Sequence, residues 1–224
     1  MAFIEVTDIS RRFEMGDTVV KALEGVNLQV ERGEFLCLMG PSGSGKSTLL
    51  NLLGGLDTPT SGLIRVGGDN IAELDENGLA DYRRKRVGFI FQSFNLLPTM
   101  TALQNVEYPM IFAGLPPAER QQRAAQLLTA VGLGDRLDHK PTELSGGQQQ
   151  RVAVARSLVN QPDILLGDEP TGNLDTKTGE EILTMLTSLN QGGQTIILVT
   201  HDPRVTKHAS RTVHMLDGHI VGEE

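Results

Sequence analysis

The chain has 224 residues, of which 39% are hydrophobic and 21% are charged, and this composition allows a core of ordinary size. Its 28 acidic residues outnumber its 20 basic residues, and the net charge of −8 argues against nucleic acid as a partner, since phosphate contacts need a cationic surface. The single cysteine, Cys37, excludes a disulfide within the chain and a multi-cysteine metal cluster, and it fits a reducing compartment. We find neither a secretory signal nor an apolar run of about 18 residues, so we expect a soluble, cytosolic chain.

Hydrophobic patterning predicts strands and helices that alternate along most of the chain. Strands are predicted over residues 3–6, 19–23, 26–30, 35–39, 64–66, 87–91, 164–167 and 195–199. Helices are predicted over residues 46–53, 75–86, 118–131, 146–159 and 178–189. Asp217-Gly218, between two short apolar runs, predicts a C-terminal hairpin. Because the runs 35–39, 87–91 and 164–167 are apolar throughout, the pattern indicates an α/β fold with a largely parallel sheet.

Prolines change the pattern between residues 92 and 142. Those that interrupt short helical runs are Pro98, Pro109, Pro116, Pro117 and Pro141. We therefore expect a helical subdomain over residues 92–142, inserted into a core formed by residues 1–91 and 143–224. The whole chain would then form a single domain.

A phosphate-binding sequence follows the apolar run 35–39 and opens the predicted helix at residue 46. It matches the pattern G-x-x-x-x-G-K-S/T in full. Its residues are Gly40, Pro41, Ser42, Gly43, Ser44, Gly45, Lys46 and Ser47, followed by Thr48. Glycines let the backbone curl so that its N–H groups converge on phosphate oxygens at the start of a helix. We expect Lys46 to supply charge to the β- and γ-phosphates of a nucleotide, and the Ser47 hydroxyl to bind Mg²⁺.

Two adjacent carboxylates, Asp168 and Glu169, end the apolar run 164–167. In phosphate-loop enzymes an acidic residue at such a strand end holds Mg²⁺. Because adjacent side chains point to different sides, the pair can divide two roles. We expect Asp168 to serve the metal and Glu169 to polarise the attacking water as a general base. Without the phosphate loop, the same pair would indicate only an acidic loop cap.

The sequence Leu144-Ser145-Gly146-Gly147-Gln148 predicts a second anion site. Ser145 is placed to cap the helix predicted over 146–159, and two glycines allow a ligand to come close to the helix start. By itself this sequence would indicate a capped helix and nothing more. In this chain we expect Ser145, Gly146, Gly147 and Gln148 to contact nucleotide.

Six features in order resemble the ATP-binding subunit of ABC transporters over essentially the whole chain. They are the phosphate loop, Gln92 after a strand, the sequence 144–148, the acidic pair, Asn173-Leu174-Asp175 and His201. The resemblance implies a phosphate-loop NTPase core with a mostly parallel sheet, an antiparallel β subdomain and an inserted α-helical subdomain. It also implies hydrolysis of ATP to ADP and phosphate, with Mg²⁺ as the cofactor.

The resemblance implies roles for residues that the patterns alone leave open. Gln92 would contact Mg²⁺ or the attacking water and link the core to the helical subdomain. Asp175 would communicate between two nucleotide sites, and His201 would contact the γ-phosphate and help to hold Glu169. Phe13 stands where the family usually has a tyrosine that stacks on adenine, and it keeps the aromatic face without the hydroxyl.

Residues 91–106 and 167–175 look like the macrolide-exporter and lipoprotein-releasing branch of that family. Members of this branch pair with permeases that have four transmembrane helices and a large external domain. The resemblance therefore implies a peripheral subunit on the cytoplasmic face of the inner membrane. Two alternatives stay open, a cell-division or signalling ATPase that regulates a permease-like partner without transport, and a nutrient-importer ATPase.

One chain carries two predicted anion-binding helix starts, one after Gly45 and one after Ser145. A single Mg²⁺-triphosphate would occupy the first, so the second needs a nucleotide from elsewhere. The simplest symmetric solution is a head-to-tail homodimer, with each γ-phosphate between Lys46 of one chain and Ser145 and Gly147 of the other. ATP would then bridge the dimer, and hydrolysis would let it open.

Overall fold

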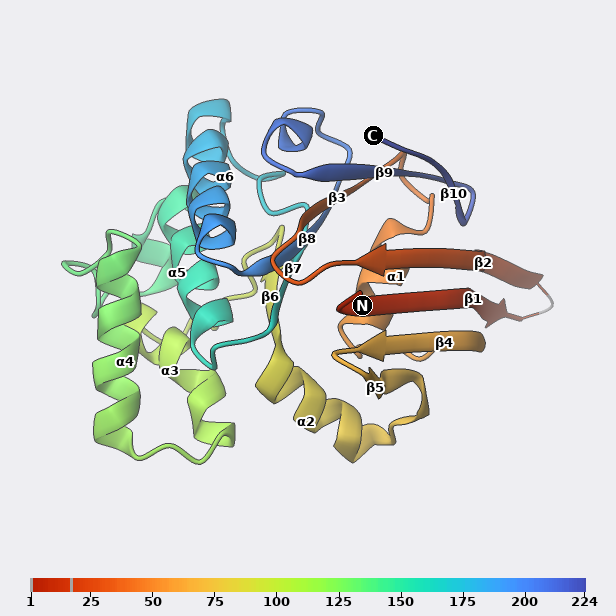
Figure 1. Ribbon diagram of the computed structural model, residues 1–224. Helices are drawn as coiled ribbons and strands as arrows, with labels where there is room; N and C mark the ends of the chain where they lie inside the picture. Colours follow the sequence, from red (N-terminus) through yellow and green to blue (C-terminus); the bar gives the residue numbers. More distant parts are fainter. Residues whose placement is uncertain (1, 17) are drawn as a thin grey trace. The chain divides into compact units, whose positions relative to one another are not determined.

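The computed structural model (Figure 1) describes residues 2–16 and 18–224. The chain divides into two compact units. The first unit comprises Met1–Arg83 and Thr187–Glu224, and the second comprises Arg84–Leu186. The division falls inside two helices, α2 (Glu76–Arg86) and α6 (Thr176–Gln191). Each unit has its own sheet pairing and its own buried side chains.

An antiparallel sheet forms one part of the first unit, and Figure 1 shows its strands side by side. Its order is β2-β1-β4-β5. The strands are β1 (Ile4–Met15), β2 (Thr18–Val30), β4 (Ser61–Val66) and β5 (Asp69–Asn70). β2 covers both predicted strands 19–23 and 26–30, because a register shift against β1 interrupts its alternation without ending it. The antiparallel β subdomain that the resemblance implies is therefore present.

The apolar strands of the first unit pair in parallel, as their composition predicts. Within this unit the order is β10-β9-β3-β8, where β3 is parallel to both neighbours and β10 pairs antiparallel to β9. The strands are β3 (Phe35–Met39), β8 (Thr195–Thr200), β9 (Arg211–Leu216) and β10 (His219–Glu223). Helix α1 (Lys46–Leu53) packs against β8 and β2. Two short 3-10 helices, η1 (Ile71–Glu73) and η3 (Val205–Lys207), complete the unit.

The second unit combines one parallel strand pair with a group of helices. β6 (Val87–Phe91) is parallel to β7 (Ile164–Asp168). The helices are α3 (Ala102–Phe112), α4 (Pro117–Ala130), η2 (Pro141–Glu143) and α5 (Gly146–Leu158). α5 packs against β6 and also against α3 and α4. Among the residues that the structure describes, no helix is long enough and apolar enough to cross a bilayer.

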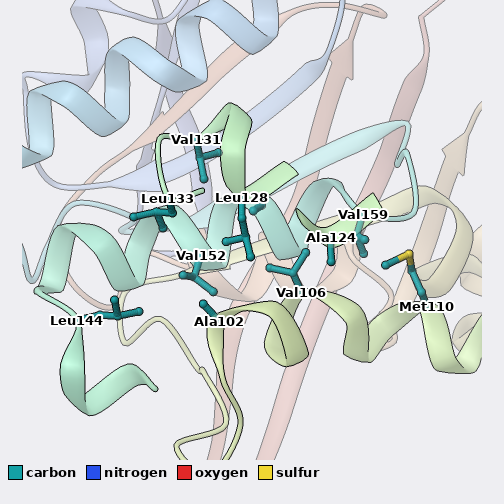
Figure 2. Close-up of a cluster of buried hydrophobic side chains, with 11 residues drawn as sticks. Ala102, Val106, Met110, Ala124, Leu128, Val131, Leu133, Leu144, Val152 and Val159 are labelled. Atoms are coloured by element: carbon teal, nitrogen blue, oxygen red, sulfur yellow. The ribbon is translucent and has the colours of Figure 1, made fainter. Parts of the chain in front are cut away.

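A cluster of buried apolar side chains joins α3, α4 and α5, and we call it the helical core. Figure 2 shows Val106 from α3, Leu128 from α4 and Val152 from α5 lying close together. The other members are Ala102, Met110, Ala124, Val131, Leu133, Leu144, Ala155 and Val159. The predicted helix over 118–131 corresponds to α4, whose buried residues are Ala124 and Leu128.

The prediction that Pro109 interrupts a helical run is wrong. α3 continues from Ala102 through Pro109 to Phe112. Thr101 and Gln104 cap its start reciprocally: the Thr101 Oγ1 accepts the Gln104 N–H at 3.2 Å, and the Gln104 Oε1 accepts the Thr101 N–H at 2.9 Å. Pro109 lies near the C-terminal end, where the loss of one N–H removes little of the helix, and the buried side chains of α3 hold it in place.

We expect the substitution Leu128→Ala to lower the free energy of unfolding by about 2–5 kcal/mol, because it opens a cavity in the helical core. Ile111→Ala in α3 is the control, since Ile111 is 48% exposed, and its effect should stay below about 1 kcal/mol. Urea unfolding followed by circular dichroism measures both changes. Equal losses for the two variants would contradict the assignment of Leu128 to the core.

Candidate functional site

The phosphate-binding sequence lies in the first unit, in the turn between β3 and α1. Gly45 is the N-cap residue of α1, with a φ of 97°, and Lys46 is the first helical residue. A glycine cap offers no side chain to the first N–H groups of the helix. The N-terminus of α1 is therefore suited to an anionic group, as the sequence predicts.

Two glycines of this loop lie against backbone that leaves no room for a side chain. A Cβ at Gly40 would stand 2.2 Å from the carbonyl oxygen of Met215, and one at Gly45 would stand 2.5 Å from that of Ala22. Met215 belongs to β9 and Ala22 to β2, so strands distant in sequence hold the loop on two sides. Because the obstacles are backbone atoms, a change of side-chain rotamer cannot relieve them.

The C-terminal hairpin supports the same loop through hydrogen bonds. The Gly218 N–H donates to the Ser44 carbonyl at 3.1 Å, and the Gly218 carbonyl accepts the Glu24 N–H at 3.1 Å. Sequence reasoning predicted a turn at Asp217-Gly218 but gave it no part in the site. The residues around 217–218 can indicate a turn, but they cannot show that Gly218 bonds to Ser44, because Ser44 lies far away along the chain.

The Lys46 side chain lies back over the phosphate loop and is 6% exposed. Its Nζ donates to the carbonyl oxygens of Gly40 and Pro41, each at 2.8 Å, and to the Ser44 Oγ at 3.4 Å. The ammonium charge is thereby fixed among the loop's own oxygens. A group held in this way can transfer some of its hydrogen bonds to phosphate oxygens without moving far.

Two further predicted residues of the first unit, Phe13 and His201, lie on β1 and directly after β8. The Phe13 ring is 36% exposed, and the Arg11 guanidinium lies over it at 4.5 Å from the centroid. Arg11 is itself fixed by two hydrogen bonds of 2.8 Å to the Asp57 carboxylate. His201 is exposed at the carboxyl end of β8.

The residue after His201 is firmly held. The Asp202 carboxylate accepts hydrogen bonds from the Arg204 Nε and Nη2, the latter at 2.6 Å, and these bonds hold the pKa of the Asp202 carboxyl below its usual range. The Asp202 N–H also donates to the Thr200 Oγ1 at 3.0 Å. The backbone on both sides of His201 is thus anchored, although its own ring is exposed.

In the second unit, Gln92 and Glu169 leave the same end of two paired strands. The register of β6 and β7 places Phe91 opposite Asp168, so the next residue of each strand is Gln92 and Glu169. Glu169 has a φ of 45°, in the left-handed region that costs energy for a residue with a side chain. Such a strained position is often found at functional sites.

Gln92 is tied to the segment that follows Glu169. The Asn173 Nδ2 donates to the Gln92 carbonyl at 3.0 Å, and the Gln92 Nε2 donates to the Asn173 Oδ1 at 3.4 Å. The Gly172 N–H donates to the Glu169 carbonyl at 3.0 Å. The sequence Asn173-Leu174-Asp175 was noted as a feature, but Asn173 was given no site role, and its side chain joins the two loops.

The sequence 144–148 forms the start of α5. Ser145 is the N-cap residue: its Oγ accepts the Gln148 N–H at 3.3 Å, while the Gln148 Oε1 accepts the Ser145 N–H at 2.9 Å. The two side chains therefore form a reciprocal cap. Gly146 and Gly147 are the first two residues of the helix, and the Gly147 backbone is buried.

Asp175 precedes α6 and bonds to its first turn. The Asp175 Oδ1 accepts the Thr178 N–H at 3.0 Å, and the Oδ2 accepts the Thr178 hydroxyl at 2.5 Å. The bond from the Thr178 hydroxyl has the largest effect on the pKa of the Asp175 carboxyl. Together with the bond from the Thr178 N–H, it holds this pKa below its usual range. In the structure Asp175 acts as a helix cap, and its predicted role between two nucleotide sites stays a prediction.

Each unit thus brings together part of the predicted set. The first unit carries Phe13, the whole phosphate loop through Thr48, and His201. The second carries Gln92, the sequence 144–148, Asp168, Glu169 and Asp175. Among residues 2–16 and 18–224, no group of three or more His, Cys, Asp or Glu side chains could hold a metal ion.

Comparison with known proteins connects this geometry to one family. A family model described as ABC transporter matches residues 23–172. An uncharacterized ABC transporter ATP-binding protein of Thermotoga maritima is 51% identical over 99% of this chain and 94% of its own length. The macrolide export ATP-binding/permease protein MacB of Marinobacter nauticus is 53% identical over 97% of this chain, which spans only 34% of the length of that protein.

Solved structures show the same similarity. Two structures of the ATP-binding cassette MJ0796 match with a TM-score of 0.91 and 45% and 46% sequence identity, over 99% of this chain and 97% of theirs. Both are described as dimeric, and one is described as a post-hydrolysis state bound to ADP and Pi.

We expect Gly40→Ala to weaken nucleotide binding by about tenfold or more. The new Cβ must displace the Met215 carbonyl, and backbone strain of about 1–3 kcal/mol corresponds to an affinity change of that size. Gly222→Ala in β10 is the control, because a Cβ there would meet no atom of the described residues within 4 Å. Titration with a fluorescent nucleotide measures both, and equal affinities would contradict the steric argument.

Proposed function

The chain belongs to the ABC transporter family, and we propose that it is the ATP-hydrolysing subunit that drives a membrane permease of the macrolide-export or lipoprotein-release type. The observation that carries the proposal is the match to MacB proteins at 50–53% identity across nearly the whole chain. Their names join an export ATP-binding part to a permease, and this chain corresponds to about a third of their length. The permease is therefore the proposed partner, with this chain peripheral on the cytoplasmic face of the inner membrane.

In the proposed site, the phosphate loop binds the triphosphate of ATP. Lys46 turns from the carbonyls of Gly40 and Pro41 toward the β- and γ-phosphates, while N–H groups at the start of α1 approach the same oxygens. Phe13 presents an exposed aromatic ring to the adenine base. Arg11, which lies over that ring, keeps it in place through its bonds to Asp57.

Glu169 is the proposed general base for the attacking water, and His201 and Gln92 assist it. The Gly172 N–H donates to the Glu169 carbonyl, and the Asn173 Nδ2 donates to the Gln92 carbonyl. These bonds hold the backbone at Glu169 and Gln92 in place. A carboxylate in a fixed position can accept the proton of the water as the water attacks the γ-phosphate. His201 lies on backbone anchored through Asp202, which suits a residue that must meet the γ-phosphate.

Mg²⁺ would accompany ATP, neutralising phosphate charge, and the residues proposed to hold it are Ser47, Asp168 and Gln92. All three offer oxygen atoms, which Mg²⁺ prefers. The lack of an acidic cluster among the described residues agrees with an ion that shares its ligands with phosphate and water.

The proposed working state is a head-to-tail homodimer with ATP at each shared site. The MJ0796 structures, which are described as dimeric and are 45% and 46% identical to this chain, support a dimer. The reciprocal cap of Ser145 and Gln148 fixes the start of α5, so its N–H groups are presented in one direction. Those groups would receive the γ-phosphate that the partner's phosphate loop holds.

Exposed apolar side chains on the second unit suit docking to a permease. Tyr108, Ile111 and Phe112 are exposed on the C-terminal half of α3, and Leu97 is exposed in the loop before it. Tyr108 and Phe112 also stack edge to face, with ring centroids 5.3 Å apart. Grouped apolar side chains of this kind favour a protein partner over water.

We expect Glu169→Gln to leave ATP binding nearly intact and to lower hydrolysis by about 10²–10⁴-fold, because the amide keeps the shape and loses the basic oxygen. Lys46→Ala should instead weaken ATP binding, since it removes the charge that faces the phosphates. Isothermal titration and a phosphate-release assay separate the two effects. If both variants lose binding equally, the proposed division of roles fails.

A cross-linking experiment tests the shared site. Two chains, each carrying Glu169→Gln, receive Ser42→Cys and Gly146→Cys respectively, differ in mass through a tag, and are mixed with a short bifunctional thiol reagent. Gly146 has room for the new side chain, since a Cβ there lies 3.4 Å from Leu174 and 3.7 Å from Phe94. We expect mixed dimers with ATP and Mg²⁺, and few with ADP.

The native cysteine provides the control for that experiment. Cys37 is buried, and burial raises the pKa of its thiol to about 12, so it stays protonated and out of reach. Chains with Cys37 alone should therefore give no cross-link. Mixed dimers that form equally with ATP, with ADP and without nucleotide would contradict the ATP-bridged dimer.

A further inference from the structure

Gln150 of α5 reaches the backbone of both proposed catalytic loops. Its side chain is completely buried. Its Nε2 donates a hydrogen bond to the Pro170 carbonyl and lies 3.5 Å from the Phe91 carbonyl oxygen. Pro170 directly follows Glu169, and Phe91 directly precedes Gln92. One amide group therefore lies between the two strand ends that carry these side chains.

The chemistry of the two neighbours fixes the orientation of this amide. Both are carbonyl oxygens, which accept hydrogen bonds, so the NH₂ group must face them and the oxygen must point away. Among the described residues the Gln150 Oε1 has no hydrogen-bond partner. An apolar side chain of the same length would fill this buried space without an unpaired acceptor of its own, but it would leave the Pro170 carbonyl without this donor. The glutamine is thus a costly choice for packing alone.

The hydrogen bond from Gln150 to Pro170 lies directly beside the strained backbone of Glu169. Glu169 is held at a φ of 45°, and its carbonyl accepts the Gly172 N–H at 3.0 Å. The bond from Gln150 fixes the next carbonyl along the chain, that of Pro170. Two successive carbonyls are then anchored, and the direction in which the Glu169 side chain leaves the backbone is determined.

We propose that Gln150 is a positioning residue for ATP hydrolysis: it holds the end of β7 so that the Glu169 carboxylate meets the attacking water. The inference rests on the proposed role of Glu169. The hydrogen bonds of its side chain go to the backbone carbonyls of Phe91 and Pro170, and Gln150 is assigned no contact with ATP. Its loss should therefore lower kcat and leave the affinity for ATP unchanged.

The test compares Gln150→Met with Gln149→Met in the full chain. Methionine keeps the length and removes the hydrogen bonds. Gln149 is the matched control, because it is the neighbouring residue of α5 and its Nε2 donates at 3.1 Å to Leu144, away from the strand ends. We expect kcat to fall by about tenfold or more for Gln150→Met, since small misplacements of a catalytic group cost about that much. The Kd for ATP and the Tm should match those of the control.

A second variant, Gln150→Glu, should give a pH dependence of kcat that a change in packing alone would not produce. In Gln150→Glu, the neutral carboxyl can donate an O–H to the Pro170 carbonyl, whereas the carboxylate repels it. Burial favours the neutral form, so protonation should begin well above the usual range for glutamate. We expect the kcat of Gln150→Glu, divided by that of the unmodified chain at the same pH, to rise from about pH 8 to about pH 6. The same ratio for Gln150→Met should stay flat.

Each outcome decides the proposal. A kcat of Gln150→Met equal to that of Gln149→Met overturns it. A fall in kcat that is accompanied by a lower ATP affinity or a lower Tm than in the control also overturns it, because it would show a structural role alone. A flat pH ratio for Gln150→Glu also overturns it. Glu169→Gln, measured alongside, separates the two levels: if it keeps full hydrolysis, the proposed function of Glu169 fails. If it loses hydrolysis while Gln150→Met does not, only the positioning role fails.

Discussion

The phosphate loop depends on a steric constraint between backbone segments. The loop glycines Gly40 and Gly45 face the carbonyls of Met215 and Ala22, and the Gly218 N–H binds the Ser44 carbonyl. None of these contacts involves a side chain that could rotate away, so β2 and the C-terminal hairpin fix the path of the loop. A loop that is ordered before its ligand arrives loses little conformational entropy on binding. The Lys46 ammonium group is therefore held on a loop whose backbone is fixed.

In the second unit, hydrogen bonds hold the loops after β6 and β7, whereas steric exclusion holds the phosphate loop of the first unit. The register of β6 and β7 sets Gln92 and Glu169 on adjacent strand ends, but the loops after them diverge from regular structure. Hydrogen bonds from side chains then replace the missing ladder, with Asn173 joining the loops and Gln150 binding the Pro170 carbonyl. Polar anchoring is weaker than steric exclusion and can rearrange, which suits the roles in ATP hydrolysis that we propose for Gln92 and Glu169.

The sequence predicted most of the elements, the family and the ATPase activity, because these rest on local patterns. Apolar runs located β3, β6, β7 and β8, and the ordered motifs led to the ABC transporter family that the comparisons confirm. Features that depend on distant contacts were missed. Pro109 concealed α3, a register shift divided β2 into two predicted strands, and Gly218 gave no sign of its bond to Ser44. The roles of the individual site residues stay predictions, because they depend on contacts with a nucleotide and not on a local pattern.

Gln150 illustrates why some functional residues cannot be read from a pattern. It is the third of three consecutive glutamines, and sequence alone gives no reason to separate it from Gln149. Their difference arises because α5 is covered on two sides: Val152 and Val159 pack in the helical core, while the opposite side packs against β6. A helix covered in this way is normally apolar all round. A polar residue on the sheet side is suited to a place where strand-end carbonyls need a donor. The position of Gln150 is therefore set by where β6 and β7 end, which is a property of the tertiary fold.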